Sequence, residues 1–381
     1  MTVILTGCKE MNKSYDNLEE ALKHPKHVVF LEVGNKPDSS WFSSLKKMKN
    51  LEHLTIKNCS IDSLEKLGDL PKLRTIKLYD TTISNFNEEI NYLQNIKELM
   101  LYNVDIEFFN PHAPLLSLDL INIQNCQHLK KIDLTKVNNV SRLWISCFEN
   151  IYPIVSGIET LKNLTLVNIE NVASLDGQFL TGENLQEVRL NDVLSMELPE
   201  KIENVQNLHI LGIVKVKLSK KYKQLIVSLP ALRDFALIDE DYSATEIVFD
   251  TPNLSLVHLD GLNLMKIPPT LYICKKIKYL YLGNNKLSSI PKEIVSFENL
   301  QELDLHNNKL QDFPKELLQL KWLGSLDVRG NPIFTLPDEL KSSKIELLID
   351  EHESVIRALK KLGHTKLING RWTYLPKEMF Q

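Results

Sequence analysis

The sequence has little cysteine: five residues in a chain of 381. They are Cys8, Cys59, Cys126, Cys147 and Cys274. None belongs to a CxxC pair or to a cysteine–histidine spacing typical of zinc, and no cluster indicates a disulfide framework. We therefore expect free, buried thiols and no metal site.

Long apolar runs and a strong excess of one charge are also missing. No stretch of about 18 apolar residues occurs, so the sequence predicts no transmembrane segment. The formal net charge is −4, which provides no broad basic field to attract nucleic acid or anionic lipid. We therefore expect no nucleic-acid partner.

Known catalytic motifs are absent as well. The chain contains no GxxxxGK[ST], GxSxG, HExxH or GxGxxG pattern, so nothing indicates a phosphate-binding loop, a nucleophile elbow, a zinc protease helix or a dinucleotide site. The 10 histidines are dispersed. These absences favour a protein that is not an enzyme and needs no cofactor.

What the sequence does contain is a repeat of 23 residues between Ile277 and Ile333. Each repeat has apolar residues at positions 1, 4, 6 and 11 and asparagine at position 9. The alternation at positions 4 to 6 predicts a short strand with both apolar side chains inward. The asparagines expected to turn the chain out of the strand are Asn285, Asn308 and Asn331. One such coil cannot bury its own apolar face, so the pattern predicts a stacked solenoid.

This LxxLxLxxNxL pattern resembles the leucine-rich repeat family, and the xIPxEIxxxxN returns are similar to those of its bacterial and intracellular members. The resemblance implies an α/β solenoid, with a curved parallel sheet on the concave face and short helical or 3-10 returns on the convex face. It also implies protein binding as the usual activity.

Less regular repeats extend through most of the chain. Their expected starts are Leu51, Leu73, Ile96, Leu115, Val140, Leu161, Leu185, Leu208, Leu232, Leu254, Ile277, Leu300 and Leu323. The spacings on either side of Leu115 are irregular, at 19 and 25 residues. The segment 129–134 offers another strand there. Either residues 110–150 form short, tight coils, which we favour, or this segment lies on the convex return.

Both ends of the array are predicted to carry caps, because a terminal coil would otherwise expose its core. Residues 1–27 are expected to contain a helix over 14–23 with Asp16 as its N-cap. Residues 28–343 form the solenoid of about 13 to 15 coils. Residues 344–381 are expected to hold a strand, a helix over 351–362 and a hairpin that turns at Asn369 and Gly370.

The N-terminal residues bear on cellular location. The segment Leu5-Thr6-Gly7-Cys8 resembles a bacterial lipobox, but only four residues precede it, without a basic or long apolar segment. As it stands, the sequence predicts a cytoplasmic protein. If the true start lies upstream of Met1, the chain would instead be lipid-anchored at Cys8.

The strand side chains that point away from the core form the candidate binding surface. Aromatic residues, which dominate binding hot spots, form two groups on it. The residues expected to bind a partner are Tyr79, Tyr102, Trp144, Arg189, His258, Tyr279, Tyr281, Asp304, His306, Asp327 and Arg329. Their alternative role is lateral packing across neighbouring strands.

Four of these residues occupy equivalent positions in adjacent repeats and are expected to form a polar square: Asp304, His306, Asp327 and Arg329. Such a square could serve acid–base chemistry or hold a metal. We favour a solvated charge cluster on an exposed sheet.

The sequence therefore predicts a non-catalytic scaffold that binds a protein on its concave face. It identifies neither the partner nor the oligomeric state. Two alternatives are a surface-displayed bacterial lipoprotein adhesin and the recognition arm of an enzyme that acts in trans.

Overall fold

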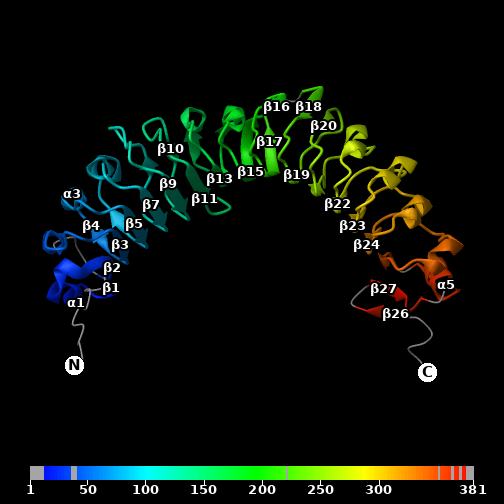
Figure 1. Ribbon diagram of the computed structural model, residues 1–381, viewed down its shortest axis with the longest axis horizontal. Helices are drawn as coiled ribbons and strands as arrows, with labels where there is room; N and C mark the ends of the chain where they lie inside the picture. Colours follow the sequence, from blue (N-terminus) through cyan, green and yellow to red (C-terminus); the bar gives the residue numbers. More distant parts are fainter. Residues whose placement is uncertain are drawn as a thin grey trace, which may run out of the picture. The chain divides into compact units, whose positions relative to one another are not determined.

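The computed structural model describes residues 13–35, 41–219, 222–350, 352–361, 364–368 and 371–374, with side chains up to residue 361. The chain forms two compact units, each built from short parallel strands (Figure 1). Unit 1 contains residues 1–182 and 193–195, and unit 2 contains residues 183–192 and 196–381. The segment Leu5-Thr6-Gly7-Cys8 lies outside the described residues.

The parallel sheet of unit 1 takes one strand from each coil. In order of pairing, its strands are β1 (Lys13–Tyr15), β2 (Val28–Gly34), β3 (His53–Lys57), β5 (Thr75–Tyr79), β7 (Glu98–Tyr102), β9 (Leu120–Gln124), β11 (Arg142–Ser146) and β13 (Leu166–Val172). Inward residues such as Leu54 and Ile56 are fully buried, whereas their neighbours on the strand are half-exposed. We call the half-exposed side the sheet face.

One coil of unit 1 starts three residues later than the sequence pattern predicted. Leu120 pairs with Glu98 on β7 and with Arg142 on β11. The coil therefore starts at Leu118 rather than at Leu115. Both leucines are buried, so apolar spacing alone did not distinguish them. With the corrected start, the spacings from Ile96 and to Val140 are both 22 residues, and the predicted irregularity disappears.

The next coil carries the same error. Leu166 is the residue that pairs with Arg142, and Val167 and Ile169 point inward. The coil starts at Leu164 rather than at Leu161. Here too both leucines are buried.

A second, smaller sheet lies in the return segments of unit 1. It pairs β8 (Phe108–Phe109), β10 (Lys131–Asp133) and β12 (Ile154–Ser156) in parallel. Residues 129–134 therefore lie on the return side, and the prediction of short, tight coils over 110–150 was wrong. Two further short strands, β4 (Ser60–Ile61) and β6 (Thr82–Ile83), pair in the same way.

Short helices and turns complete the coils of unit 1. They are α2 (Phe42–Leu45), α3 (Glu65–Gly68), α4 (Phe86–Glu89), η2 (Ile90–Tyr92), η3 (Ile158–Thr160), the strand β14 (Leu175–Asp176) and η4 (Gly177–Thr181). Figure 1 shows helical turns of this unit on the side opposite the sheet.

The N-terminal helix differs from its prediction. The helix α1 covers only Leu18–Lys23, between β1 and the turn η1 (Pro25–His27). Its N-cap is Asn17, whose Oδ1 accepts hydrogen bonds from the backbone N of Glu19 at 2.7 Å and of Glu20 at 3.4 Å. Asp16 was the wrong cap because the helix starts one residue later than the pattern suggested.

Unit 2 has the same construction. Its strands are β15 (Glu187–Glu197), β17 (Ile210–Leu218), β19 (Asp234–Ile238), β21 (Leu256–His258), β22 (Tyr279–Tyr281), β23 (Glu302–Asp304), β24 (Ser325–Asp327) and β25 (Glu346–Leu348). From β17 to β25 each strand pairs in parallel with the next one named. Register in this unit agrees with the predicted repeat starts.

The return side of unit 2 changes along the chain. It begins with a small parallel sheet of β16 (Lys201–Ile202), β18 (Gln224–Val227) and β20 (Glu246–Phe249). It continues with the 3-10 turns η5 (Pro269–Ile273), η6 (Lys292–Ser296), η7 (Lys315–Gln319) and η8 (Asp338–Ser342). Proline precedes or opens each turn, as the IPxEI pattern predicts.

The C-terminal segment follows the last parallel strand. The helix α5 covers Glu353–Lys361, and the strands β26 (His364–Ile368) and β27 (Arg371–Tyr374) pair in antiparallel fashion. β27 also pairs antiparallel with β25. The hairpin therefore covers the free edge of the last parallel strand.

In most coils the chain turns at repeat position 8, where the backbone is left-handed; the coil that starts at Val140, with Cys147 at this position, is an exception. In unit 1 the residues with positive φ at this position are Asn35, Asn58, Asp80, Asn103, Asn125 and Asn171. In unit 2 they are Asp192, Lys215, Asp239, Gly261, Asn284, Asn307 and Gly330. Asparagine, aspartate and glycine are the residues that tolerate this conformation best.

Candidate functional site

The sheet face of unit 1 carries a group of aromatic side chains, Tyr79, Tyr102 and Trp144, which we call the aromatic patch. The rings of Tyr79 and Tyr102 stack at a centroid distance of 4.5 Å and an interplanar angle of 7°. They come together because the two residues are register partners on β5 and β7. The Lys57 ammonium lies 5.6 Å from the Tyr79 ring centroid.

The aromatic patch is fixed from its other side by Asn122. The Asn122 Nδ2 donates a hydrogen bond of 3.1 Å to the Tyr102 hydroxyl. Burial raises the pKa of the Tyr102 hydroxyl, with a contribution from Tyr79, so this phenol stays neutral. Trp144 is the register partner of Asn122, and 40% of its surface is exposed. The patch thus offers an exposed indole beside an ordered tyrosine pair.

Sequence reasoning missed several residues of this surface because two coils were out of register. Asn122, Gln124, Asn168 and Glu170 lie on the sheet face. The predicted starts at Leu115 and Leu161 would instead place Asp119, Ile121, Thr165 and Val167 at those repeat positions. The left-handed residues Asn125 and Asn171 would have located both strands.

The sheet face of unit 2 carries a second group, which we call the tyrosine–histidine patch. It consists of His258, Tyr279, Tyr281, Asp304, His306, Asp327 and Arg329, on and beside β21 to β24. His258 and Tyr281 are register partners with ring centroids 5.0 Å apart. The His258 Nε2 also lies 3.1 Å from Asp260 Oδ2. Burial, followed by the effect of the Glu302 carboxylate, raises the pKa of the Tyr281 hydroxyl.

His306 is held on both sides of its ring. Its Nδ1 lies 2.8 Å from Asp304 Oδ1, and its Nε2 lies 2.9 Å from Asn284 Nδ2. The Asn284 Oδ1 accepts from Asn307 Nδ2 at 2.9 Å, which fixes the orientation of the Asn284 amide. With this amide orientation Nε2 accepts a hydrogen bond and Nδ1 donates one, so both ring nitrogens of His306 have partners.

The backbone leaves room for this ring because position 283 is glycine. A Cβ placed on Gly283 would lie 2.1 Å from His306 Cε1. Any larger residue there would displace the imidazole from its position between Asp304 and Asn284.

Asp327 and Arg329 form their own pair on the next coil. The Arg329 Nε donates to both Asp327 oxygens, at 3.0 and 3.1 Å, and its backbone N donates to Asp327 Oδ1 at 3.0 Å. The four residues of the predicted polar square thus form two separate pairs within their own coils. In the part of the chain that the structure describes, no group of three or more potential ligands is arranged to hold a metal ion.

The last two predicted site residues, Tyr279 and Arg189, also lie on the sheet face of unit 2. The Tyr279 hydroxyl donates to Gln301 Oε1 at 3.4 Å. Arg189, on β15, forms an ion pair with Glu187. Arg189 lies several strands away from the tyrosine–histidine patch, so the structure does not bring it together with that patch.

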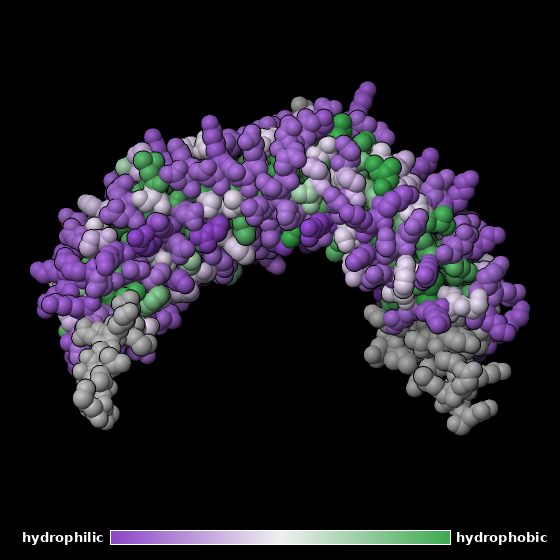
Figure 2. All heavy atoms as spheres, in the orientation of Figure 1, coloured by the Kyte–Doolittle hydropathy of each residue, from purple (hydrophilic) through white to green (hydrophobic). Residues whose placement is uncertain are grey.

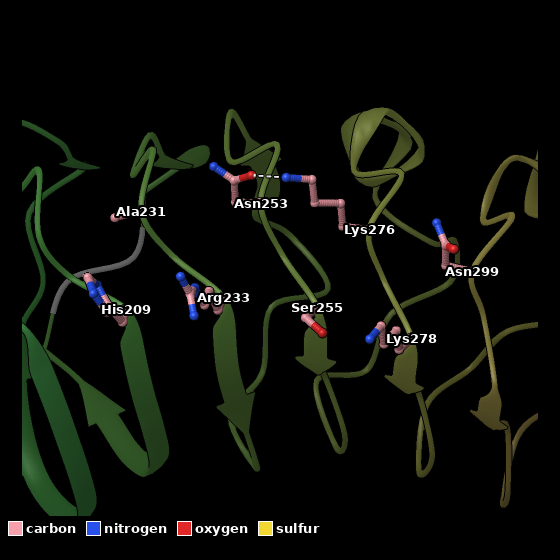
Figure 3. Close-up of a pocket in the computed structure, with 8 residues that line it drawn as sticks. All are labelled: His209, Ala231, Arg233, Asn253, Ser255, Lys276, Lys278 and Asn299. Carbon is pink, nitrogen blue, oxygen red and sulfur yellow. Dashed lines mark hydrogen bonds between the residues drawn. The ribbon is translucent and has the colours of Figure 1, made fainter.

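A groove in unit 2, which sequence reasoning missed, runs along the edge where the strands begin (Figure 3). Its volume is about 520 Å³. Basic side chains of three successive coils line it, among them Arg233, Lys276 and Lys278. Elsewhere the visible surface of each unit is mostly hydrophilic, with hydrophobic side chains in small groups (Figure 2).

The asparagines predicted to turn the chain are buried in unit 2. The Asn308 Nδ2 donates to Leu282 O at 2.9 Å and to Leu305 O at 3.0 Å, and its Oδ1 accepts from Leu287 N at 2.9 Å. Asn285 and Asn331 make equivalent bonds. Each asparagine thereby ties its own coil to its neighbours, a structural role.

The cysteines of the described chain are also structural. Cys59, Cys126, Cys147 and Cys274 are buried, and the last three are free thiols. Burial raises the pKa of the Cys126 and Cys147 thiols to about 12, which keeps both protonated and unreactive at neutral pH. No helix among the described residues is both long and apolar enough to cross a membrane.

Comparison with known proteins identifies the repeat type. Residues 252–310 and 275–333 match the family model described as leucine rich repeat. No curated protein matches the chain.

Solved structures of the same fold come from bacteria and plants. An internalin (InlF) from Listeria monocytogenes has 17% identity and a TM-score of 0.56, over 87% of this chain and 89% of that one. The functional domain of InlJ from Listeria monocytogenes has 15% identity and a TM-score of 0.56, over 88% and 71%. The receptor kinase HAESA ectodomain from Arabidopsis, in complex with a peptide hormone, has 16% identity and a TM-score of 0.55, over 90% and 70%. At these identities the similarity shows the fold alone.

Proposed function

Because this chain belongs to the leucine-rich repeat family, we propose that it is a non-catalytic scaffold that binds a protein through the sheet faces of its units. The observation that carries the proposal is the arrangement of the two patches. Their aromatic and charged side chains are partly exposed, yet neighbouring side chains hold them in fixed positions. Ordered side chains lose little conformational entropy on binding, which favours affinity.

The composition of the patches supports a protein ligand. Tyrosine, tryptophan and arginine are the residue types that contribute most to protein–protein interfaces, and both patches combine aromatic rings with polar groups. The HAESA ectodomain, which shares the fold, was solved with a peptide ligand. That example supports recognition of a polypeptide by a solenoid of this kind.

A catalytic role for Asp304 and His306 is disfavoured by their hydrogen bonds. A general base needs a nitrogen that is free to accept a proton from substrate. The His306 Nε2 already accepts from Asn284, and Nδ1 is engaged by Asp304. We therefore propose that this pair orders the patch rather than catalysing a reaction.

We also propose that residues 1–27 and 344–381 act as caps of the array. In the C-terminal segment, β27 occupies the edge of β25 that would otherwise be exposed. Covering an open strand edge prevents edge-to-edge association with other chains.

Binding through the sheet faces is testable with single substitutions. We expect Trp144→Ala and Tyr281→Ala each to weaken capture of the protein partner by about tenfold or more. We expect the free energy of unfolding to change by at most about 1 kcal/mol, because both side chains are partly exposed. Capture is measured by quantitative mass spectrometry after affinity purification from an extract of the source cells.

The matched control is Tyr92→Ala. Tyr92 is 45% exposed and lies on the turn η2 of the return side of unit 1, so its removal should leave capture unchanged. Equal capture by wild type and both patch variants would contradict the proposal. Turnover of a substrate by purified protein, abolished in Asp304→Asn and His306→Gln, would establish an enzyme instead.

A further inference from the structure

The groove along the edge of unit 2 is lined by two rows of side chains (Figure 3). The inner row holds His209, Arg233, Ser255 and Lys278, all at repeat position 2. The outer row includes Asn253, Lys276 and Asn299, each the residue before a repeat start. Both rows therefore cross successive coils instead of surrounding one point.

The charge of this groove differs from that of the chain as a whole. The chain carries a net charge of −4, yet the lining contains three permanent cations and no carboxylate. None of Arg233, Lys276 and Lys278 forms an ion pair within the described chain; Lys276 donates to the neutral Asn253 Oδ1 at 2.7 Å.

Arginines elsewhere in the described chain show what a paired cation looks like. Arg142 contacts Asp119 at 2.7 Å and Glu98 at 3.1 Å, and Arg329 contacts Asp327. Arg142 is the first residue of its strand and directly follows the position-2 residue of its coil, so it lies near the same edge of the sheet as the groove residues do in unit 2. Acidic partners are thus available to this edge in unit 1 but are not placed in the groove of unit 2.

The backbone holds the inner row at fixed intervals. The carbonyl of His209 accepts from Arg233 N at 2.9 Å, and the carbonyl of Arg233 accepts from Ser255 N at 2.8 Å. The carbonyl of Ser255 then accepts from Lys278 N at 2.8 Å. Adjacent strands lie about 4.8 Å apart, so Arg233 and Lys278 are separated by roughly 10 Å and the whole row spans roughly 14 Å.

The spacing of the cations along the row indicates an extended ligand rather than a compact one. Cations spread along a line do not converge on a single small anion, and they fit a ligand that carries several negative charges along its length. An extended peptide rises about 3.3 Å per residue, so roughly four residues span the row. Acidic side chains of such a segment would reach Arg233 and Lys278 and form charge-assisted hydrogen bonds with them.

The outer row continues to an aromatic residue. Trp322 precedes the next repeat start after Asn299, and strand register places it one coil further along. It is 58% exposed, and the Lys321 ammonium lies 4.8 Å from its ring centroid. An exposed indole at this end would give an apolar contact for the residue that follows the acidic segment.

We infer that this edge groove binds an acidic, extended segment of the protein partner. The inference rests on the proposed function, because it assigns a second contact to the same partner. Arg233 and Lys278 bind its carboxylates, the amides of Asn253 and Asn299 line the opposite side, and Trp322 contacts the adjoining residue.

A direct test uses a synthetic probe and the full chain. Fluorescein-labelled hexaglutamate is titrated with wild-type protein at low salt, and anisotropy is recorded. We expect saturable binding that weakens as salt increases, and no binding of labelled hexaglutamine. The double variant Arg233→Gln/Lys278→Gln should weaken binding about tenfold or more, with an unchanged circular dichroism spectrum.

The matched control removes the same charge elsewhere in unit 2. Lys292→Gln/Lys315→Gln alters two exposed lysines on the turns η6 and η7 and should change the dissociation constant less than about twofold. Equal weakening by both double variants would show a general effect of net charge and overturn the inference. Tighter binding of a labelled thymidine hexanucleotide, lost in the groove variant, would assign the groove to nucleic acid and also overturn it.

The outcome is independent of the test of the sheet faces. If the groove variant retains full affinity for hexaglutamate while Tyr281→Ala loses partner capture, the groove inference fails and the proposed function stands. If the groove variant loses hexaglutamate while the patch variants capture normally, the proposed sheet-face function fails.

Discussion

The turns that end the strands in unit 1 and in the last repeats of unit 2 reach the same backbone shape with different side chains. Both use a left-handed residue at position 8, such as Asn58 in unit 1 and Asn307 in unit 2. At position 9, unit 2 has the buried Asn308, which bonds to neighbouring coils. Unit 1 has Thr81, whose hydroxyl donates only to Tyr79 O in its own coil, at 2.8 Å. Position 8 is therefore common to both units, and the asparagine at position 9 adds cross-coil bonds in one of them.

This difference explains why the last three repeats are the most recognisable in the sequence. The most recognisable repeats are those with asparagine at position 9, yet coils without it stack in the same parallel register. Apolar residues or small hydrogen-bond donors suffice at position 9 when position 8 makes the turn. The asparagines reinforce a shape that the backbone already has.

The largest contrast is expected between Asn308→Ala in unit 2 and Val104→Ala in unit 1, both at position 9. Loss of the Asn308 amide leaves the buried Leu287 N–H without its acceptor, so we expect destabilisation of about 2–4 kcal/mol. Val104→Ala removes two buried methyl groups and should cost about 1–2 kcal/mol. Urea denaturation measures both, and equal losses would show that the asparagine bonds add nothing.

A smaller effect is expected at position 8. Asn125 has φ of +55°, a conformation that costs a residue with a Cβ roughly 1–2 kcal/mol. Asn125→Ala should therefore destabilise unit 1 by about 1 kcal/mol, whereas Asn125→Gly should be nearly neutral, because glycine adopts this conformation readily. If Asn125→Gly destabilises as much as Asn125→Ala, the side chain rather than the backbone is what matters there.

The smallest effect concerns the thiols buried in the coils of unit 1. Burial raises the pKa of Cys126 and Cys147 to about 12, above an unfolded value of about 8.5. As pH rises, the unfolded chain therefore loses these protons before the folded chain does. The contribution of the buried thiols to the free energy of unfolding is fully present below about pH 8.5 and is lost as pH rises toward 12. We expect each thiol to lower stability by roughly 1 kcal/mol at one pH unit above 8.5. Denaturation of Cys126→Ala between pH 8 and 10 should show a shallower decline than wild type; an identical slope would contradict this account.

Much of the fold followed from apolar spacing, because the inward positions 4 and 6 repeat without interruption in unit 2. The errors arose where two leucines three residues apart were both buried, as with Leu115 and Leu118. Period and hydrophobicity cannot separate such a pair. The left-handed residue can: Asn125 lies seven residues after Leu118 and marks the end of its strand.

The candidate site was predictable only in part. Alternation along the strands placed Tyr79, Tyr102 and Tyr281 on the sheet face, and their register partners follow from repeat spacing. The contact of His306 with Asn284 depends on side-chain rotamers and on the absence of a Cβ at Gly283. No spacing rule specifies those features, so the predicted polar square resolved into separate pairs.

The basic groove shows another limit of sequence reasoning. Arg233 and Lys278 are far apart in the chain, and Arg233 lies directly before the acidic Asp234 in the sequence. Only the three-dimensional arrangement shows that neither cation is ion-paired within the described chain. The sequence offers only the net charge of the chain and runs of like charge. Neither reveals a local excess of positive charge that is assembled from separate coils.

The most direct test of the central claim, that the sheet faces bind the partner, is hydroxyl-radical footprinting of the chain alone and in the purified complex. The account predicts slower oxidation of Trp144, Tyr281 or both in the complex, with Tyr92 on the return side unchanged. Protection of Tyr92 with unchanged oxidation of Trp144 and Tyr281 would place the partner on the opposite face and contradict the account.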